Sequence, residues 1–210
     1  MSKDIKNQST DSLFFSRSNL DNSSVDKIVS NALHKADDGE LFMEFCESES
    51  FVFDDQRLKS ASFDTSKGFG LRAVAGESSG YAHSSDIDEK SLKKASDTVN
   101  FVTKDNNANF NAAFSQTNRK LYNEANPINE TEFSEKVNVL KNIDEYARSK
   151  NSQVKQVSAS LNGEWQAVRI YRPGGIVIED LRPLVRLYIS IVLEKDGRQE
   201  NGSRGSGGRV

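Results

Sequence analysis

The stretch ELFMEFCESESFVFDDQRLKSASFDTSKGFGLRAVAGESSGYAHS, residues 40–84, decides the fold. In its first part Leu41, Met43 and Phe45 fall on one face, and the residues between them fall on the other. This period of two is typical of a β-strand. The turns that follow are too short to hold a helical crossover, so the stretch predicts an antiparallel meander.

Four strands are predicted in this meander, with turns at residues 54–56, 65–68 and 76–80. The inward face of the third strand is predicted to hold Phe69, Leu71, Ala73 and Ala75. Gly68-Phe69-Gly70 matches part of a dinucleotide-binding fingerprint, but that fingerprint works only where a strand ends and a helix begins. Here the glycines begin a strand, so we expect Gly70 to allow a bulge or a close backbone approach.

Helices are predicted on both sides of the meander. Asn22 or Ser23 is the expected N-cap of the first, whose apolar positions recur on one face up to Ala36, with Gly39 ending it. Asp86 is the expected cap of the second, which runs to Lys104. A helix, four strands and a helix predict an α+β fold in which the helices pack on one face of the sheet.

The second half repeats this outline, so the sequence predicts two consecutive helix-plus-antiparallel-meander units. Asparagine dominates residues 105–129, which predicts a linker. A helix is expected over residues 130–150 and strands over 154–161, 165–171, 176–178 and 184–193, with turns at Asn162-Gly163, Pro173-Gly174-Gly175 and Asp196-Gly197. The predicted domains are therefore residues 1–104 and 130–210, joined by the linker over 105–129.

Composition excludes several classes of protein. The net charge of −3 gives no general attraction to phosphate backbones, so nucleic acid is not an expected partner. No apolar run approaches the ~20 residues that span a bilayer, and the polar N-terminus does not resemble a signal peptide. The single cysteine excludes an internal disulfide. A cytoplasmic location with no membrane contact is the expectation.

Two long segments carry a family resemblance. SFDTSKGFGLRAVAGESSGYAHSSD, residues 62–86, resembles the N-terminal domain of the TldD/PmbA metallopeptidase family. IEDLRPLVRLYISIVLEKDGRQENGSRGSGGR, residues 178–209, is similar to the segment that precedes the metal site in the TldD branch. The resemblance runs over about residues 23–209. It implies a zinc-dependent peptidase subunit that cuts unfolded peptides and pairs with a PmbA-like (TldE) partner.

One feature of that family has no match in this sequence. The resemblance implies a helix reading His-Glu-x-x-x-His, whose glutamate acts as base toward a metal-activated water. Without that motif we expect no zinc on this chain, although the complete family enzyme binds it. The chain looks like a truncated N-terminal fragment that serves as scaffold and assembly surface and is catalytically silent alone. The alternatives are a non-enzymatic binding module that docks on a PmbA/TldE-like partner, or a non-functional gene relic.

The potential metal ligands are few. A catalytic zinc needs about three protein ligands, and the only histidines are His34 and His83. Cys46 and His83 lie on strands of one predicted sheet, but the favoured interpretation is a packed cysteine and a half-exposed histidine. An acidic group is interpreted as solvated surface carboxylates, because no nucleophile or base is tied to it by spacing: Glu44, Glu47, Glu49, Asp54 and Asp55. No catalytic or metal residue is therefore predicted.

The glycine-rich C-terminal segment offers the one candidate binding surface. Glycines let another backbone approach closely, and the two arginines could meet carboxylates. In a peptidase that binds its substrate as an added strand, this segment would line the cleft. The competing interpretation, a disordered tail, is favoured for this chain. The candidate cleft-wall residues are Arg204, Gly205, Gly207, Gly208 and Arg209.

Overall fold

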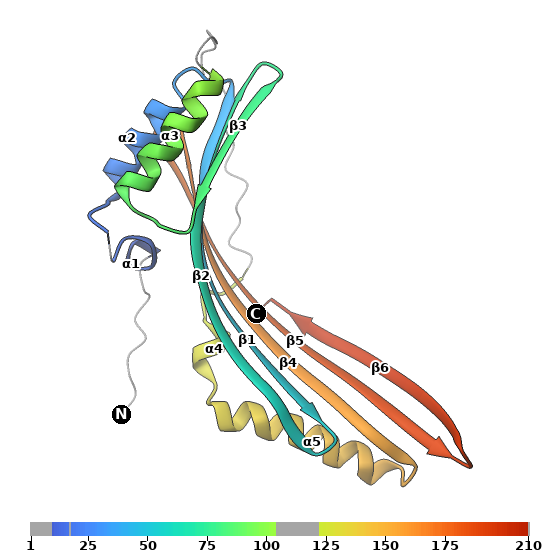
Figure 1. Cartoon of the computed structure of the whole chain (residues 1–210). Coiled ribbons are helices and arrows are strands. Elements are labelled where there is room, and N and C mark those ends of the chain that lie inside the picture. The colour runs from blue at the N-terminus through green and yellow to red at the C-terminus, as the bar shows by residue number, and fades with distance from the viewer. Residues whose placement is uncertain (1–9, 17, 104–121, 210) are drawn as a thin grey trace, which may run out of the picture. The chain divides into compact units, whose positions relative to one another are not determined.

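Six strands form one antiparallel sheet in the computed structural model of the chain, in the order β3-β2-β1-β4-β5-β6 (Figure 1). The structure describes residues 10–16, 18–103 and 122–209. The predicted α+β class is confirmed, with a helix, a meander and a helix followed by helices and a second meander. The elements are α1 (Thr10–Phe15), α2 (Asn22–Ala32), β1 (Asp38–Asp54), β2 (Arg57–Ala75), β3 (Ser78–Ser84), α3 (Glu89–Thr103), α4 (Pro127–Glu130), α5 (Phe133–Lys150), β4 (Val154–Arg172), β5 (Ile176–Lys195) and β6 (Arg198–Gly208).

The chain divides into two compact units that each draw on three segments. Unit 1 consists of Met1–Cys46, Ser66–Leu121 and Ala167–Leu181. Unit 2 consists of Glu47–Thr65, Tyr122–Gln166 and Arg182–Val210. Strands β1, β2, β4 and β5 each contribute to both units. The domain boundaries predicted from sequence stay a prediction, because most of the proposed linker lies outside the described residues.

Unit 1 is built around helices α2 and α3 and the inward faces of its strands. Figure 1 shows α2 and α3 side by side, and their stripes hold fully buried residues such as Val29 and Leu92. The predicted inward face of the strand after residue 68 is confirmed, since all four of its apolar residues are buried. Both helix caps differ from the predicted ones. Asp21 caps α2, one residue before the predicted Asn22. At α3 the Ser91 N–H donates to the Asp88 side chain at 2.7 Å, two residues after the predicted cap Asp86.

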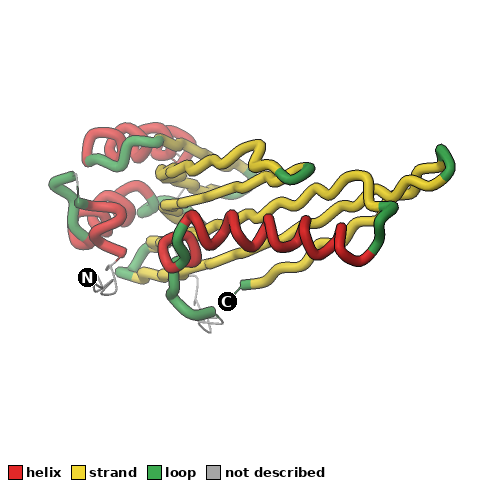
Figure 2. Tube along the Cα trace, turned by 90° about the horizontal axis from the view of Figure 1, so that it is seen from below, coloured by secondary structure: helices red, strands yellow, loops and turns green. Residues whose placement is uncertain are grey.

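Unit 2 is held together by helix α5 lying along one face of its strands, as Figure 2 also shows. Leu140 of α5 packs against Phe51 and Phe53 of β1 and Ala159 of β4. Leu187 and Ile189 of β5 extend this cluster. The apolar residues of each strand occupy alternate positions, so the residues between them face away from α5.

Two predicted turns are wrong, because the chain passes through them as strand. Residues 65–68 lie inside β2, so the meander has three strands where four were expected. Asn162-Gly163 lies inside β4, although it carries the sequence signature of a hairpin turn. The turns at 54–56, at Pro173-Gly174-Gly175 and at Asp196-Gly197 are confirmed, with positive φ at Asp55, Gln56 and Gly197, for example.

The C-terminal segment also differs from expectation. The strands expected over residues 176–178 and 184–193 are one strand of 20 residues, β5, and Pro183 is buried within it. The favoured interpretation of the glycine-rich tail as disordered is wrong, because residues Arg198–Gly208 pair with β5 over their whole length. The asparagine-rich residues 104–121 lie outside the described residues, and Asn126 caps the short helix α4 that follows.

Candidate functional site

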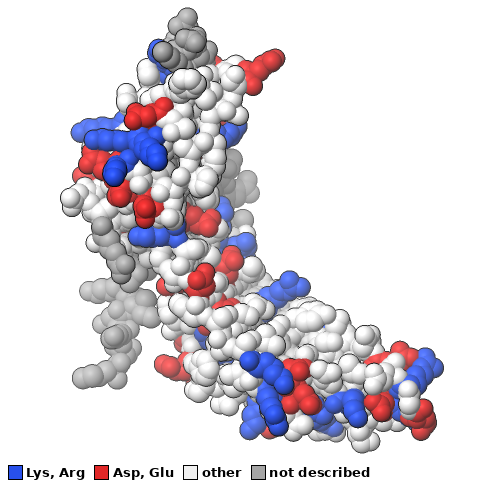
Figure 3. All heavy atoms as spheres, in the orientation of Figure 1, with Lys and Arg blue, Asp and Glu red and all other residues white. Residues whose placement is uncertain are grey.

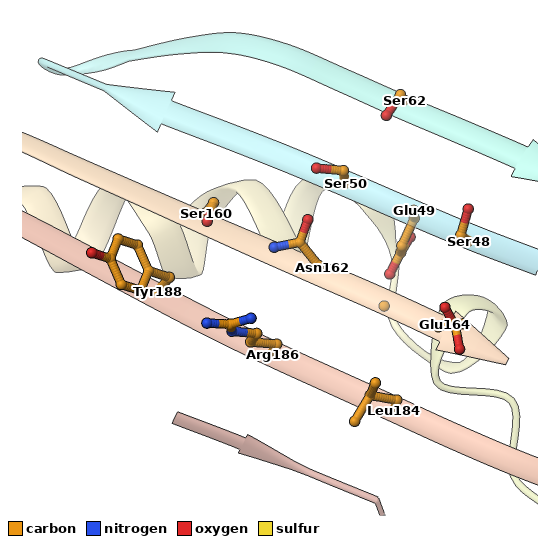
Figure 4. Close-up of a pocket in the computed structure, with 11 residues that line it drawn as sticks. Ser48, Glu49, Ser50, Ser62, Ser160, Asn162, Glu164, Leu184, Arg186 and Tyr188 are labelled. Carbon is orange, nitrogen blue, oxygen red and sulfur yellow. The ribbon is translucent and has the colours of Figure 1, made fainter. Parts of the chain in front are cut away.

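A concave pocket of about 620 Å³ opens on the face of unit 2 that is turned away from α5. Its floor is formed mainly by alternate residues of four strands, which Figure 4 shows as sticks, and Glu49 and Gly163 between them also line it. We call it the serine-lined pocket. Its lining residues are Ser48, Glu49, Ser50, Ser62, Ser160, Asn162, Gly163, Glu164, Leu184, Arg186 and Tyr188.

The charged residues that line the pocket are Arg186, Glu49 and Glu164. Lys136 contacts both carboxylate oxygens of Glu49, at 2.7 and 2.8 Å, and therefore neutralises it. The side chains of Arg186 and Glu164 make no hydrogen bond or ion pair within the part of the chain that the structure describes. Arg186 is exposed and Glu164 is half-buried. A charged pair that is not committed to internal contacts is thus available in a polar concavity.

Glycines of β6 leave one side of this pocket open. In the register of β5 and β6, Tyr188 lies opposite Gly205 and Arg186 lies opposite Gly207. A Cβ on Gly205 would come within 3.5 Å of the Tyr188 ring and 3.9 Å of an Arg186 nitrogen. Directly paired residues project from the same face of a sheet. Because Gly205 and Gly207 have no side chain, Tyr188 and Arg186 are open on the side of β6.

Beneath the pocket, on the α5 side, a buried ion pair fixes the start of α5. Lys136 is 5% exposed and donates to the Ile128 carbonyl at 2.7 Å as well as to Glu49, so its three hydrogens are satisfied. A Cβ on Gly163 would lie 3.0 Å from the Glu49 carboxylate. A side chain at position 163 would therefore crowd the carboxylate, and glycine avoids this within strand β4.

In unit 1 a buried arginine ties helix α1 to the sheet. Arg169 is 2% exposed, pairs with Asp11 at 2.6 Å and with Glu179, and lies over the rings of Phe14 and Phe15. Burial alone would lower the pKa of Arg169, but hydrogen bonds to Asp11 and Tyr171 outweigh it and raise that pKa. Burial has the opposite effect on the Tyr171 phenol, whose pKa it raises. This network is structural, since its members are committed to one another.

A second, smaller pocket of unit 2 is lined mainly by apolar groups. It has a volume of about 370 Å³ and lies where α4 meets α5 above β1 and β2. Phe63 and Phe133 line it while remaining 58% and 55% exposed. Phe133 packs against Phe51 with ring centroids 5.4 Å apart. Two of its titratable groups are bound to each other, because Lys136 pairs with Glu49, and Glu132 is the third such group in its lining.

Potential metal ligands do not converge within the described ranges. No group of three or more His, Cys, Asp or Glu residues there is placed to hold a metal ion. His83 of β3 stacks on Tyr81, with ring centroids 5.6 Å apart, and Cys46 lies on β1, which β2 separates from β3. The residues that we describe therefore do not fit a zinc site.

The acidic residues singled out in the sequence are dispersed among separate structural contacts. Glu47 accepts a hydrogen bond from Asn126 at 2.7 Å, and Asp55 pairs with Arg148 at 2.6 Å. Hydrogen bonds from Ser158 and then Gln156 lower the pKa of Asp54. They do not form an acid–base pair.

The candidate cleft-wall residues lie together on the outermost strand. Residues 204, 205, 207 and 208 belong to β6, which is exposed on both faces, and Arg209 lies over the ring of Tyr122 at 5.5 Å. The functional candidates that sequence reasoning missed are Arg186, Glu164, Asn162 and Tyr188. The detectable signal was the alternation of polar residues along β4 and β5, which the assumed turn at Asn162-Gly163 interrupted.

Charge is mixed over the surface. On the face drawn in Figure 3, lysine and arginine side chains are interspersed with aspartate and glutamate, without a large area of one sign. None of the helices in the described ranges is long and apolar enough to cross a bilayer.

Two family models match the chain. Residues 39–99 match the model described as PmbA/TldA metallopeptidase domain 1, and residues 126–210 match the PmbA/TldA metallopeptidase central domain. Among curated proteins, a metalloprotease TldD homolog of Haemophilus influenzae is 35% identical over 196 residues, which is 91% of this chain and 41% of that protein. A TldD homolog of Buchnera aphidicola is 28% identical over 178 residues, 84% of this chain and 37% of that protein.

Solved structures share the fold. TldE from Thermococcus kodakarensis superimposes with a TM-score of 0.59 at 17% identity, covering 89% of this chain and 43% of that one. A Bacteroides thetaiotaomicron protein described as a candidate modulator of DNA gyrase gives a TM-score of 0.66 at 15% identity, covering 88% of this chain and 44% of that one. The chain spans about two fifths of the length of the curated relatives it matches. The family models and the curated relatives agree, and the chain belongs to the PmbA/TldD metallopeptidase family as an N-terminal portion of a TldD-type protein.

Proposed function

We propose that this chain is the scaffold and assembly part of a TldD-like zinc metallopeptidase subunit and is catalytically silent alone. The observation that carries the proposal is a match to two family domains in a chain whose described residues hold no cluster of metal ligands. In the complete protein, zinc and peptide-bond hydrolysis would come from the part of the relatives that lies outside the matched two fifths. The site of action would be the cytoplasm.

The proposed assembly partner is a PmbA/TldE-like protein. The likeness of the fold to TldE supports it, because related subunits of one family commonly assemble through matching surfaces. Strand β6 supports it as well, since it is the last strand of the sheet and is exposed on both faces in the described chain. An unpaired edge of this kind invites pairing with another chain.

The same edge is the proposed wall of a peptide cleft. An extended peptide can add to a sheet edge through its main chain, independently of its sequence. On β6 the residues proposed to line that path are Arg204, Gly205, Gly207 and Gly208, with Arg209 immediately after the strand. The alternative function, a non-enzymatic module that docks on the partner, draws on the same exposed edge.

The test is a comparison of the purified chain with and without a TldE-type protein from the same organism. For the chain alone we expect no zinc by elemental analysis and no hydrolysis of reduced casein that a chelator abolishes. When both proteins are present, we expect them to co-purify. Zinc bound at one equivalent, or hydrolysis that a chelator abolishes, by the chain alone would contradict catalytic silence. Aggregation without any partner would favour a gene relic.

A further inference from the structure

The serine-lined pocket lies on a face of the sheet and not at its edge. Most of its lining comes from β1, β4 and β5, and each of these strands has a neighbouring strand on both sides. Their backbone N–H and C=O groups are therefore taken up by the sheet. A ligand in this pocket is recognised by side chains, because the addition of a strand needs a free edge.

The polar side chains of the pocket have unused hydrogen-bonding groups. Further along the same face, Ser158 and Gln156 of β4 both donate to Asp54 of β1, at 2.6 and 2.8 Å. Within the pocket, by contrast, these side chains make no hydrogen bond to any residue in the described ranges: Ser50, Ser160, Asn162, Arg186 and Tyr188. A bound ligand would supply the missing partners.

Charge within the pocket is balanced. Lys136 neutralises Glu49, which leaves the guanidinium of Arg186 and the carboxylate of Glu164. Figure 4 shows the Arg186 guanidinium turned toward Tyr188, whereas Glu164 lies at the other end of the pocket. The pocket thus offers donors at one end, an acceptor at the other and no net charge. This combination suits an uncharged ligand that both donates and accepts.

Hydroxyl groups meet this requirement. A ligand hydroxyl can accept from a guanidinium or amide N–H and donate to a carboxylate or a serine oxygen. Hydrogen bonds to a charged group are stronger than those between neutral groups, so Arg186 and Glu164 would hold hydroxyls most firmly. A ligand with several hydroxyls can use both ends of the pocket and the serines between them.

Tyr188 adds an apolar surface to these polar groups. It is 39% exposed, and Gly205, its partner in β6, has no side chain to cover the ring. An aromatic ring with a polar tip suits a ligand that is apolar on one surface and polar at its rim. A sugar ring has this character, since its C–H groups form its faces and its hydroxyls project from its edge.

We propose that the serine-lined pocket binds a neutral saccharide. The Tyr188 ring packs against a sugar ring, Arg186 and Asn162 donate to its hydroxyls, and Glu164 accepts from them. The site uses neither the free edge of β6 nor a metal centre. Saccharide binding by the 210-residue chain therefore holds or fails independently of the proposed function.

The experiment crosses a set of probes with a set of variants. Maltotriose, cellotriose and mannotriose are titrated into the chain and followed by NMR chemical shifts, beside inorganic phosphate and trialanine as probes for an anion site and a peptide site. The variants are Tyr188→Ala, Tyr188→Phe and Arg186→Gln. The control is Tyr146→Ala, because Tyr146 is 64% exposed on α5 and lies outside the pocket.

We expect at least one trisaccharide to bind saturably to the wild-type chain. Tyr188→Ala and Arg186→Gln should each weaken that binding about threefold to tenfold, through the loss of one ring contact or one hydrogen-bonding group. Tyr188→Phe should weaken it less than Tyr188→Ala, since the ring remains. Tyr146→Ala should leave it unchanged.

Three results would overturn the proposal. The first is that none of the trisaccharides binds saturably at millimolar concentrations, and the second is an equal affinity in the wild type and Tyr188→Ala. The third is tighter binding of phosphate or trialanine than of any trisaccharide, which would make the pocket an anion or a peptide site. Circular dichroism and thermal unfolding check that each variant is folded, and Arg186→Gln gives the same test where Tyr188→Ala does not fold.

Discussion

At the residue scale, the structure depends on a few buried charges whose partners come from distant parts of the sequence. Lys136 and Glu49 are separated by 87 positions, yet their side chains are 6% and 8% exposed and lie 2.7 Å apart. A charge buried to this degree is tolerated only with its partner and its hydrogen bonds in place. Removing Lys136 or Glu49 alone leaves the other charge buried and unpaired, whereas removing both leaves no charge without a partner.

The buried pair gives the first prediction. Lys136→Met leaves the Glu49 carboxylate buried and unpaired, and should lower the free energy of unfolding by about 3–5 kcal/mol. The double variant Glu49→Leu/Lys136→Met should recover most of that loss, because no uncompensated charge remains. Urea unfolding measures both variants. Lys141→Met is the control, since Lys141 is 59% exposed in its ion pair with Glu145 and should change stability by at most about 0.5 kcal/mol. Equal losses in the single and double variants would contradict the prediction.

Asp54 gives a prediction about pH. Its folded-state pKa lies below the unfolded value of about 3.9, because Ser158 and Gln156 donate hydrogen bonds to the carboxylate. Its contribution to stability is therefore complete above the unfolded pKa and is lost as the pH falls through the folded one. Asp54→Asn cannot titrate, so the stability difference between the wild type and this variant should shrink from pH 6 to pH 3. Urea unfolding across that range checks it, and a constant difference would count against the assignment.

At the scale of elements, strand β6 depends on glycine at one position and tolerates side chains at the next. A Cβ on Gly207 would lie 2.3 Å from the Val185 carbonyl oxygen, whereas a Cβ on Gly208 would meet nothing within 4 Å. Gly207→Ala should therefore loosen the end of the β5–β6 pairing, and Gly208→Ala should not. Hydrogen exchange measured on peptides covering residues 198–208 should be faster in the first variant only. Wild-type exchange in Gly207→Ala would show that the strand accommodates the methyl group.

Sequence patterns predicted the elements whose apolar residues alternate or recur within one segment. The stripe of α2 and the inward face of β2 after residue 68 are examples, because burial on one side imposes their period. The patterns failed at Asn162-Gly163 and at residues 65–68, where strand pairing overrides the local preference for a turn. Gly163 is explained only by Glu49, a residue more than a hundred positions away. That contact cannot be seen in a local window.

The candidate site was missed for a related physical reason. Arg186 and Tyr188 form a pocket with Ser50, Ser160 and Asn162 only once β1, β4 and β5 are neighbours in that order. The polar alternation of each strand was visible in the sequence, but by itself it is typical of any solvated sheet face. What distinguishes this face is the concavity and the absence of internal partners for Arg186 and Glu164 among the described residues. Both of these are properties of the tertiary structure.

At the scale of the whole molecule, the balance of charge bears on what the chain attracts. The sequence has 28 lysines and arginines against 31 aspartates and glutamates. Several of the arginines are also engaged locally: Arg148 with Asp144, Arg169 with Asp11, and Arg172 with Asp38. Affinity for a nucleic acid comes mainly from cations that displace the counterions of phosphates. Neither the net charge nor the distribution of cations provides them.

We therefore predict that the chain does not bind DNA or RNA to a measurable extent. Fluorescence anisotropy with a labelled duplex and a labelled single strand at physiological salt should give dissociation constants weaker than about 10⁻⁴ M, the weak end of the range for non-specific binders. A strongly basic protein of similar size serves as the positive control. Binding that weakens steeply as salt increases would contradict the prediction, since that dependence counts the phosphates neutralised by lysine and arginine. In that case Arg186, which makes no internal ion pair within the described chain, would be the first position to substitute, because it can meet a phosphate without losing an existing partner.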